Sequence, residues 1–217
     1  MKKEYYLLYL VAFLAFSSCT KKHPKTDNIF KFKEYISFNT FGNASIEDPI
    51  RVVLAKPTSQ FEATQEIPSE YLIINPKTEG SFFIENGTQL LFKPEEALRP
   101  DTEYTVTLKL SRFFEDIDPE FKNYTFGFKT ITPNFKINLG NLQSYSKEWQ
   151  YLTGSIETSD WVAAEKAKQL VTASQEGKTL HIDWPTEETK GTFFNFTIDS
   201  IHRKKENSQI RIAWNGE

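Results

Sequence analysis

The sequence contains few of the residues that form disulfide bonds or that commonly act in catalysis. It has one cysteine, Cys19, and three histidines, His23, His181 and His202. With no second cysteine the chain forms no internal disulfide, so hydrophobic packing must hold the fold. The histidines are scattered, which disfavours a zinc site, because zinc ligands cluster at short spacing. The formal net charge of −3 lacks the basic excess typical of nucleic-acid-binding proteins.

The chain also lacks the patterns of nucleophilic catalysis. There is no G-x-S-x-G motif, and the only thiol stands near the N-terminus. A nucleophile needs a base and an orienting acid within reach, and the sequence indicates no such group. We therefore expect no enzyme, no catalytic residue and no cofactor.

The N-terminus has a short basic segment, an apolar stretch over residues 5–16 and two serines directly before Cys19. The stretch is too short to span a bilayer as a helix. This arrangement resembles the lipobox of a bacterial lipoprotein, with Phe16 where that family most often has Leu. The resemblance implies a signal peptide over residues 1–18 and a lipid bilayer partner held through acylated Cys19. The alternative is an ordinary signal peptide with an incidental cysteine.

Residues 19–29 are polar and basic and predict a lipidated tether. Surface lipoproteins of the Bacteroidetes type usually carry acidic residues after the cysteine, whereas Lys21 and Lys22 stand here. We therefore expect a lipid-anchored protein of the cell envelope, on the outer membrane and facing the periplasm. Exposure at the cell surface is the alternative.

Residues 30–132 alternate short apolar runs with turn residues, and aromatics make up 15% of the chain, which favours strands. In the run over residues 102–110, every second residue is apolar, which is typical of a half-buried strand. Asn86-Gly87 predicts a hairpin, and Pro100-Asp101 a turn. The expected strands cover residues 35–38, 50–55, 71–74, 81–84, 89–92, 102–110 and 124–130. This spacing predicts an antiparallel, immunoglobulin-like β-sandwich.

Residues 134–217 predict a second β-sandwich, so the fold class is all-β with two consecutive sandwiches. Alternation covers residues 135–139, 180–184, 194–198 and 210–214. Residues 159–170 are ambiguous: they fit a short helix capped by Ser159 or Asp160, or a strand through Trp161 followed by a loop. Residues 202–208 predict a hairpin tip. The last strand ends with no closing edge, so we expect this module to be incomplete and the chain to be a fragment of a longer product.

Several segments together resemble the N-terminal region of bacterial alpha-2-macroglobulins. In the first module these are DPIRVVL (48–54), IINP (73–76), LFKPEEALRPDTEYTVTL (91–108) and FGFKT (126–130). In the second they are LTGSIETSDW (152–161), LHIDWP (180–185) and FNFTIDSIHRKKENSQIRIAWNG (194–216). The resemblance implies a bacterial Ig-like domain followed by a macroglobulin-type domain.

Full-length members of this family are endopeptidase inhibitors that close around a protease after a bait region is cut, and many carry a thioester. No Cys-Glu-Gln motif exists here, because Cys19 is the only cysteine. The resemblance therefore implies only a membrane-anchored scaffold region. Its expected partners are downstream macroglobulin-type domains and, in the full-length protein, proteases.

Two groups of residues are candidate ligand sites. Glu115, Asp116, Asp118 and Glu120 lie close together in sequence, as calcium ligands do, but the spacing is not that of an EF-hand. We favour a solvated loop there, packed on Phe113, Phe114 and Phe121, and therefore no metal.

Trp149, beside two tyrosines, is the weak candidate for a ligand-binding residue, because tryptophan rings stack on sugars. We expect Trp184 and Trp214 to pack in the core. A glycan-binding or adhesive Ig-like surface lipoprotein is thus the alternative function.

Overall fold

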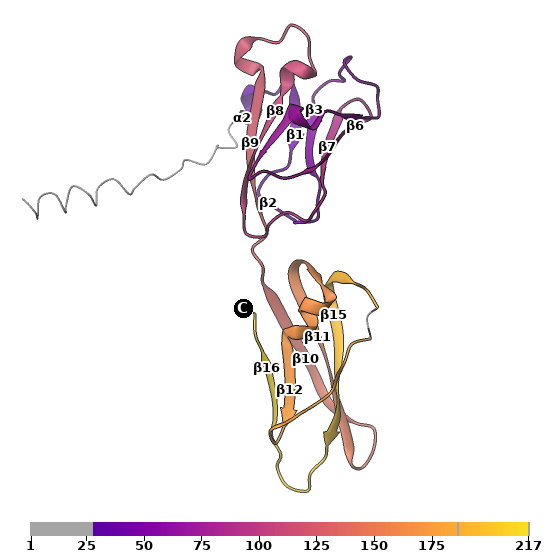
Figure 1. The fold of residues 1–217 in the computed structure, drawn as a ribbon. Helices are drawn as coiled ribbons and strands as arrows, with labels where there is room; N and C mark the ends of the chain where they lie inside the picture. Colours follow the sequence, from indigo (N-terminus) through magenta and orange to yellow (C-terminus); the bar gives the residue numbers. More distant parts are fainter. Residues whose placement is uncertain (1–27, 186, 217) are drawn as a thin grey trace, which may run out of the picture.

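A computed structural model of the protein describes residues 28–185 and 187–216 (Figure 1). It confirms the expected all-β class: two modules of packed antiparallel sheets follow each other along the chain, one above the other in Figure 1. The signal peptide, Cys19 and most of the expected tether lie outside the described residues. No helix among the described residues is long and apolar enough to cross a membrane.

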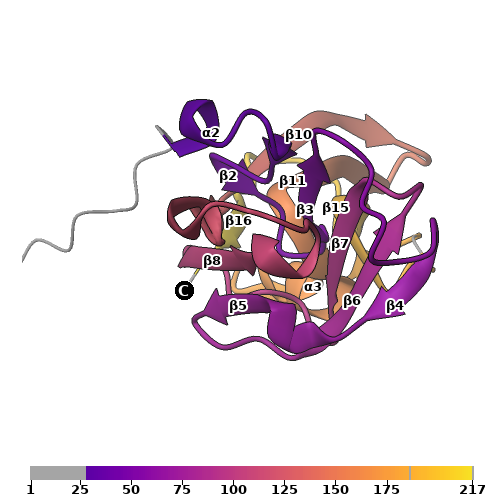
Figure 2. The same ribbon diagram turned by 90° about the horizontal axis from the view of Figure 1, so that it is seen from above.

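The first module packs a five-stranded sheet on a four-stranded one, and Figure 2 shows it end-on. In the five-stranded sheet the order is β1 (Ile36–Asn39), β3 (Ile50–Leu54), β7 (Gln89–Pro94), β6 (Gly80–Glu85) and β4 (Gln65–Ile67). In the four-stranded sheet it is β2 (Asn43–Ala44), β9 (Asn123–Thr130), β8 (Glu103–Lys109) and β5 (Leu72–Asn75). All pairs are antiparallel except β2 with β9.

Short helical turns complete this module. They are α2 (Asn28–Lys31) and the 3-10 turns η1 (Ser69–Tyr71), η2 (Leu110–Arg112) and η3 (Pro119–Phe121). Ile29, which the sequence had placed at the end of the tether, packs against the core.

Alternating side chains build the core of the first module. In β8, Tyr104, Val106 and Leu108 are buried while the residues between them are half-exposed, which confirms the alternation read from the sequence. The β6–β7 hairpin turns through Asn86 and Gly87, both at positive φ (53° and 68°). Asparagine and glycine tolerate this conformation, so the predicted turn is confirmed.

A buried polar pair lies inside the first module. The Tyr124 hydroxyl donates to Asn39 Oδ1 at 2.7 Å, and both residues are almost inaccessible to solvent. Burial raises the pKa of Tyr124 to about 12, above its ordinary value near 10. The neutral phenol is therefore favoured in the folded state, and its contribution to stability is present below pH 10 and lost as pH rises through 12.

We predict that Tyr124→Phe lowers the free energy of unfolding at pH 7 by roughly 1 kcal/mol, because the Asn39 oxygen loses its buried donor. The same variant should lose less of its stability than the wild type between pH 10 and pH 12. Urea unfolding at pH 7, 10 and 11.5 measures both effects. An equal alkaline loss in the two proteins would contradict the assignment to Tyr124.

The second module packs a four-stranded sheet on a three-stranded one. The first has the order β10 (Phe135–Ser144), β11 (Trp149–Ala163), β15 (Lys190–His202) and β14 (Ile182–Asp183). The second has the order β13 (Lys178–Thr179), β12 (Val171–Gln175) and β16 (Ile210–Trp214). Its core is centred on Ile156, Phe194, Phe196 and Ile198.

Residues 159–170 contain both of the structures that the sequence left open. Strand β11 continues to Ala163, and the helix α3 (Ala164–Gln169) begins directly after it. No side chain caps this helix, so the expected cap by Ser159 or Asp160 is wrong. Both residues lie in the strand, where their side chains make other contacts.

Residues 202–208 do not form the predicted hairpin tip. His202 still belongs to β15, and the chain then crosses to the opposite sheet, where β16 pairs with β12 rather than with β15. The polar composition of this segment fits any exposed connection, so it did not reveal which strand follows.

Candidate functional site at the junction between the modules

The linker between the modules is short and is fixed by hydrogen bonds to the second module. It runs from Thr130, the end of β9, to Phe135, the start of β10. The Ser159 hydroxyl accepts from the Asn134 amide at 2.9 Å and donates to the Thr132 carbonyl at 3.0 Å. The linker backbone is therefore held at two points, Thr132 and Asn134.

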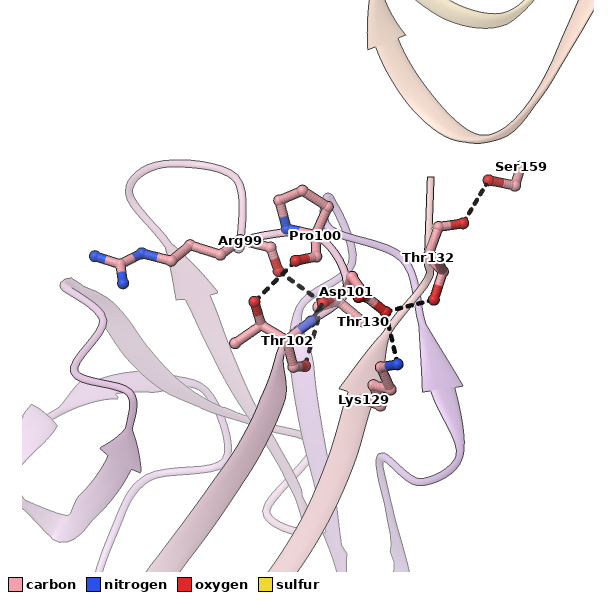
Figure 3. Close-up of polar contacts among 8 residues, drawn as sticks. All are labelled: Arg99, Pro100, Asp101, Thr102, Lys129, Thr130, Thr132 and Ser159. Carbon is pink, nitrogen blue, oxygen red and sulfur yellow. Dashed lines mark hydrogen bonds and ion pairs between the residues drawn. The ribbon is translucent and has the colours of Figure 1, made fainter. Parts of the chain in front are cut away.

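The predicted turn at Pro100-Asp101 holds the linker from the side of the first module (Figure 3). Asp101 lies at a φ of 50°, and its Oδ1 accepts from Thr132 Oγ1 at 2.5 Å and from Lys129 Nζ at 2.6 Å. These two donors hold the pKa of Asp101 below its usual value. Beneath the turn, the buried Thr130 hydroxyl donates to the Arg99 carbonyl at 2.6 Å.

Asp160 joins the two modules directly. Its Oδ1 accepts from the Ser45 hydroxyl at 2.6 Å, and its Oδ2 accepts from the Ile46 amide at 2.8 Å. Ser45 and Ile46 belong to the loop between β2 and β3, more than 110 residues earlier in the chain. Hydrogen bonds to a carboxylate are stronger than neutral ones, so this contact holds the relative position of the modules.

An ion pair lies beside Asp160. Lys190 Nζ of β15 is 2.6 Å from Glu47 Oε2 of the first module. Both side chains are partly exposed, at 53% and 31%, and pairs of this kind contribute little to stability. Its main effect is to neutralise one lysine and one carboxylate at the junction.

We predict that Asp160→Ala loosens the junction while each module stays folded. Loss of a hydrogen bond to a charged group costs roughly 1.5–3 kcal/mol, so the Ile46 amide should exchange its hydrogen about ten to a hundred times faster. Hydrogen exchange resolved by NMR measures this. Asp183→Ala, in β14 and outside the junction, serves as the control. Unchanged exchange at Ile46 would show that Asp160 does not hold the modules.

A cavity of about 640 Å³ lies at this junction, with walls from both modules. Its apolar wall comes from Ile46, Leu98, Ile131, Phe135, Trp161, Val162 and Leu170. Trp161 is 44% exposed. Apolar pockets of this size between domains are typical ligand sites. The sequence did not predict this site because its walls come from six separate segments.

A second pocket, of about 540 Å³, lies at the opposite end of the second module and includes Trp149. Trp149 is 38% exposed and its indole contacts the His202 ring edge-on, with 5.1 Å between centroids. His202 Nδ1 is buried and has no hydrogen-bond partner. The rings of Tyr145 and Tyr151 are tilted to one another, with 6.0 Å between their centroids. The structure thus places the predicted ligand residue at an accessible aromatic surface.

The structure does not bring the four candidate metal ligands together. Glu115 accepts from Gln60 Nε2 at 2.7 Å, and Glu120 pairs with Lys31 at 2.7 Å. Among residues 28–185 and 187–216, no three acidic, histidine or cysteine side chains are placed to hold a metal. Asp116, at a φ of 50°, and Asp118 lie in the same loop. The predicted packing of Phe113 and Phe114 beneath it is confirmed.

The two tryptophans expected in the core differ. Trp184 is half-buried and its ring lies 5.2 Å from that of Phe196. Trp214 is 57% exposed, so its expected burial is wrong. Its strand, β16, is at the edge of the three-stranded sheet, where no further strand of the described chain covers it.

Comparison with models of protein families and with curated proteins found no match for the chain. The resemblance to the alpha-2-macroglobulin family therefore remains an expectation from the residues quoted above.

Proposed function

We propose that the chain is the membrane-anchored N-terminal scaffold region of an alpha-2-macroglobulin-like endopeptidase inhibitor. In this role it performs no chemistry. It carries the downstream macroglobulin-type domains and holds them near the membrane of the cell envelope. The bait region and thioester would belong to the rest of the protein.

The junction is the observation that supports this proposal best. A scaffold has to transmit position from the anchor to the distant domains, which a flexible linker would not do. Here the Asp160 carboxylate bonds two groups of the first module, and Ser159 and Asp101 hold Thr132 from either side. Two sandwiches that follow a lipobox-like sequence in the chain suit such a membrane-proximal scaffold.

The reading frame around this chain tests the proposal. Continuation into several more β-modules, with a bait segment cut by proteases, is expected. The product of that frame should trap a protease such as trypsin, and Cys19→Ser should release the trap from the membrane without abolishing cleavage of the bait. A natural stop directly after the second module would contradict the proposal.

Glycan binding is the second candidate, and the surface around Trp149 favours it. An accessible indole beside two tyrosines is a suitable platform for a sugar ring. A polysaccharide pull-down with wild type and Trp149→Ala tests this, with Trp214→Ala as a control for another exposed indole. Binding that is lost only with Trp149→Ala would replace the scaffold as the leading function.

A further inference from the structure

The junction cavity has mainly apolar walls, but lysine side chains also line it. Its apolar residues come from both modules, and Trp161 presents an exposed ring to it. Lys166, on helix α3, and Lys190, on β15, also line it. A ligand that fits these walls needs an apolar body, and the lysines define where a polar group would lie.

All but one of the charged side chains that line the cavity already have an ion-pair or hydrogen-bond partner in the protein. Glu47 and Lys190 neutralise each other at 2.6 Å. The Asp160 carboxylate accepts from the Ser45 hydroxyl, the Ile46 amide and the Trp161 amide. The Lys166 ammonium forms no ion pair or hydrogen bond with any of the described residues. It is therefore the one charged group of the cavity that can take an ionic ligand.

We propose that this cavity binds a small amphipathic carboxylate, such as a medium-chain aliphatic acid. The alkyl chain would lie against Ile131, Val162 and Leu170, and the carboxylate would accept from the ammonium of Lys166. This binding site goes beyond the scaffold role and does not depend on it.

The size and position of the cavity support a small ligand. Its volume of about 640 Å³ lies within the range of ligand pockets in proteins. Because both modules form the walls, a bound acid would contact Leu98 of one and Val162 of the other. Bound ligand would thereby add to the stability of the junction.

Octanoate and the neutral 1-octanol test the proposal on the full chain, by isothermal titration calorimetry at low salt. We expect saturable binding of one octanoate and weaker binding of octanol. Lys166→Gln should weaken octanoate about tenfold and leave octanol unchanged, because it removes the charge and preserves the apolar stem. Ala97→Trp, at an exposed position of the wall, should abolish the binding of both.

Lys168→Gln is the matched control. Lys168 is on the same helix, but its ammonium pairs with Glu165 at 2.7 Å and it does not line the cavity. Thermal unfolding of each variant verifies that it is folded. The proposal is overturned if octanoate does not bind, if octanol binds equally well, or if Ala97→Trp or Lys166→Gln leaves octanoate binding unchanged.

Discussion

Replacing Cys19 by serine is expected to transfer the protein almost completely from the membrane fraction to the soluble fraction. A serine hydroxyl does not accept the acyl modification that the lipobox-like segment implies. Each buried methylene of an acyl chain contributes about 0.8 kcal/mol, and a single myristoyl chain binds only marginally. Stable anchoring therefore predicts more than one chain on the wild-type residue.

Metabolic labelling with a palmitate analogue and fractionation measure this result. Thr20→Ser is the matched control, because it changes the neighbouring residue and keeps the thiol. The wild type and Thr20→Ser should be labelled and sediment with membranes, and Cys19→Ser should do neither. A mature wild-type protein that is soluble and whose thiol reacts with maleimide would refute the anchor and, with it, the membrane-bound scaffold.

Period-two alternation depends only on neighbouring residues. It predicted seven strands of the first module and β10, β14, β15 and β16 of the second, but neither β11 nor β12. Val106 and Leu108 are fully buried, as their positions between Thr and Lys indicated. The short strands β2 and β4 were not predicted. Each has two or three residues, and each exists only through pairing with a distant strand, β9 or β6. Such pairing leaves little trace in the local sequence.

Alternation also predicts which face of a strand points inward, but it does not show whether another element covers that face. Trp214 pairs with the buried Val171, so its side is the inner one. It is nevertheless exposed, because β16 is an edge strand. Asp160 is the converse case: its sequence neighbours predict a helix cap, whereas two of the three donors to its carboxylate lie over 110 residues away. The junction and its cavity could not be predicted for the same reason.

Gly154 offers the second large effect, because an aromatic ring occupies the space where a side chain would begin. In the sheet, Gly154 pairs with Leu139 on one side and Phe196 on the other. A Cβ there would overlap the Phe196 ring and lie 3.0 Å from the Asn138 carbonyl oxygen. Phe196 is buried in the centre of the second core, so it cannot leave its position without disturbing the packing around it.

We predict that Gly154→Val lowers the free energy of unfolding of the second module by roughly 3 kcal/mol, the upper part of the usual range for overpacked cores. Thermal unfolding followed by near-ultraviolet circular dichroism measures the change. Gly191→Ala is the control: its Cβ would lie no closer than 3.5 Å to its neighbours, and we expect it to be neutral or slightly stabilising.

A double variant separates steric conflict from the loss of a flexible backbone position. Phe196→Leu shortens the side chain that overlaps the new Cβ, so Gly154→Val should cost less in that background than in the wild type. Sites in contact show interaction energies of about 0.5–3 kcal/mol in such cycles. Strictly additive effects would mean that a clash with the Phe196 ring is not the reason why residue 154 is glycine. The LTGSIETSDW segment would then need Gly154 for another reason.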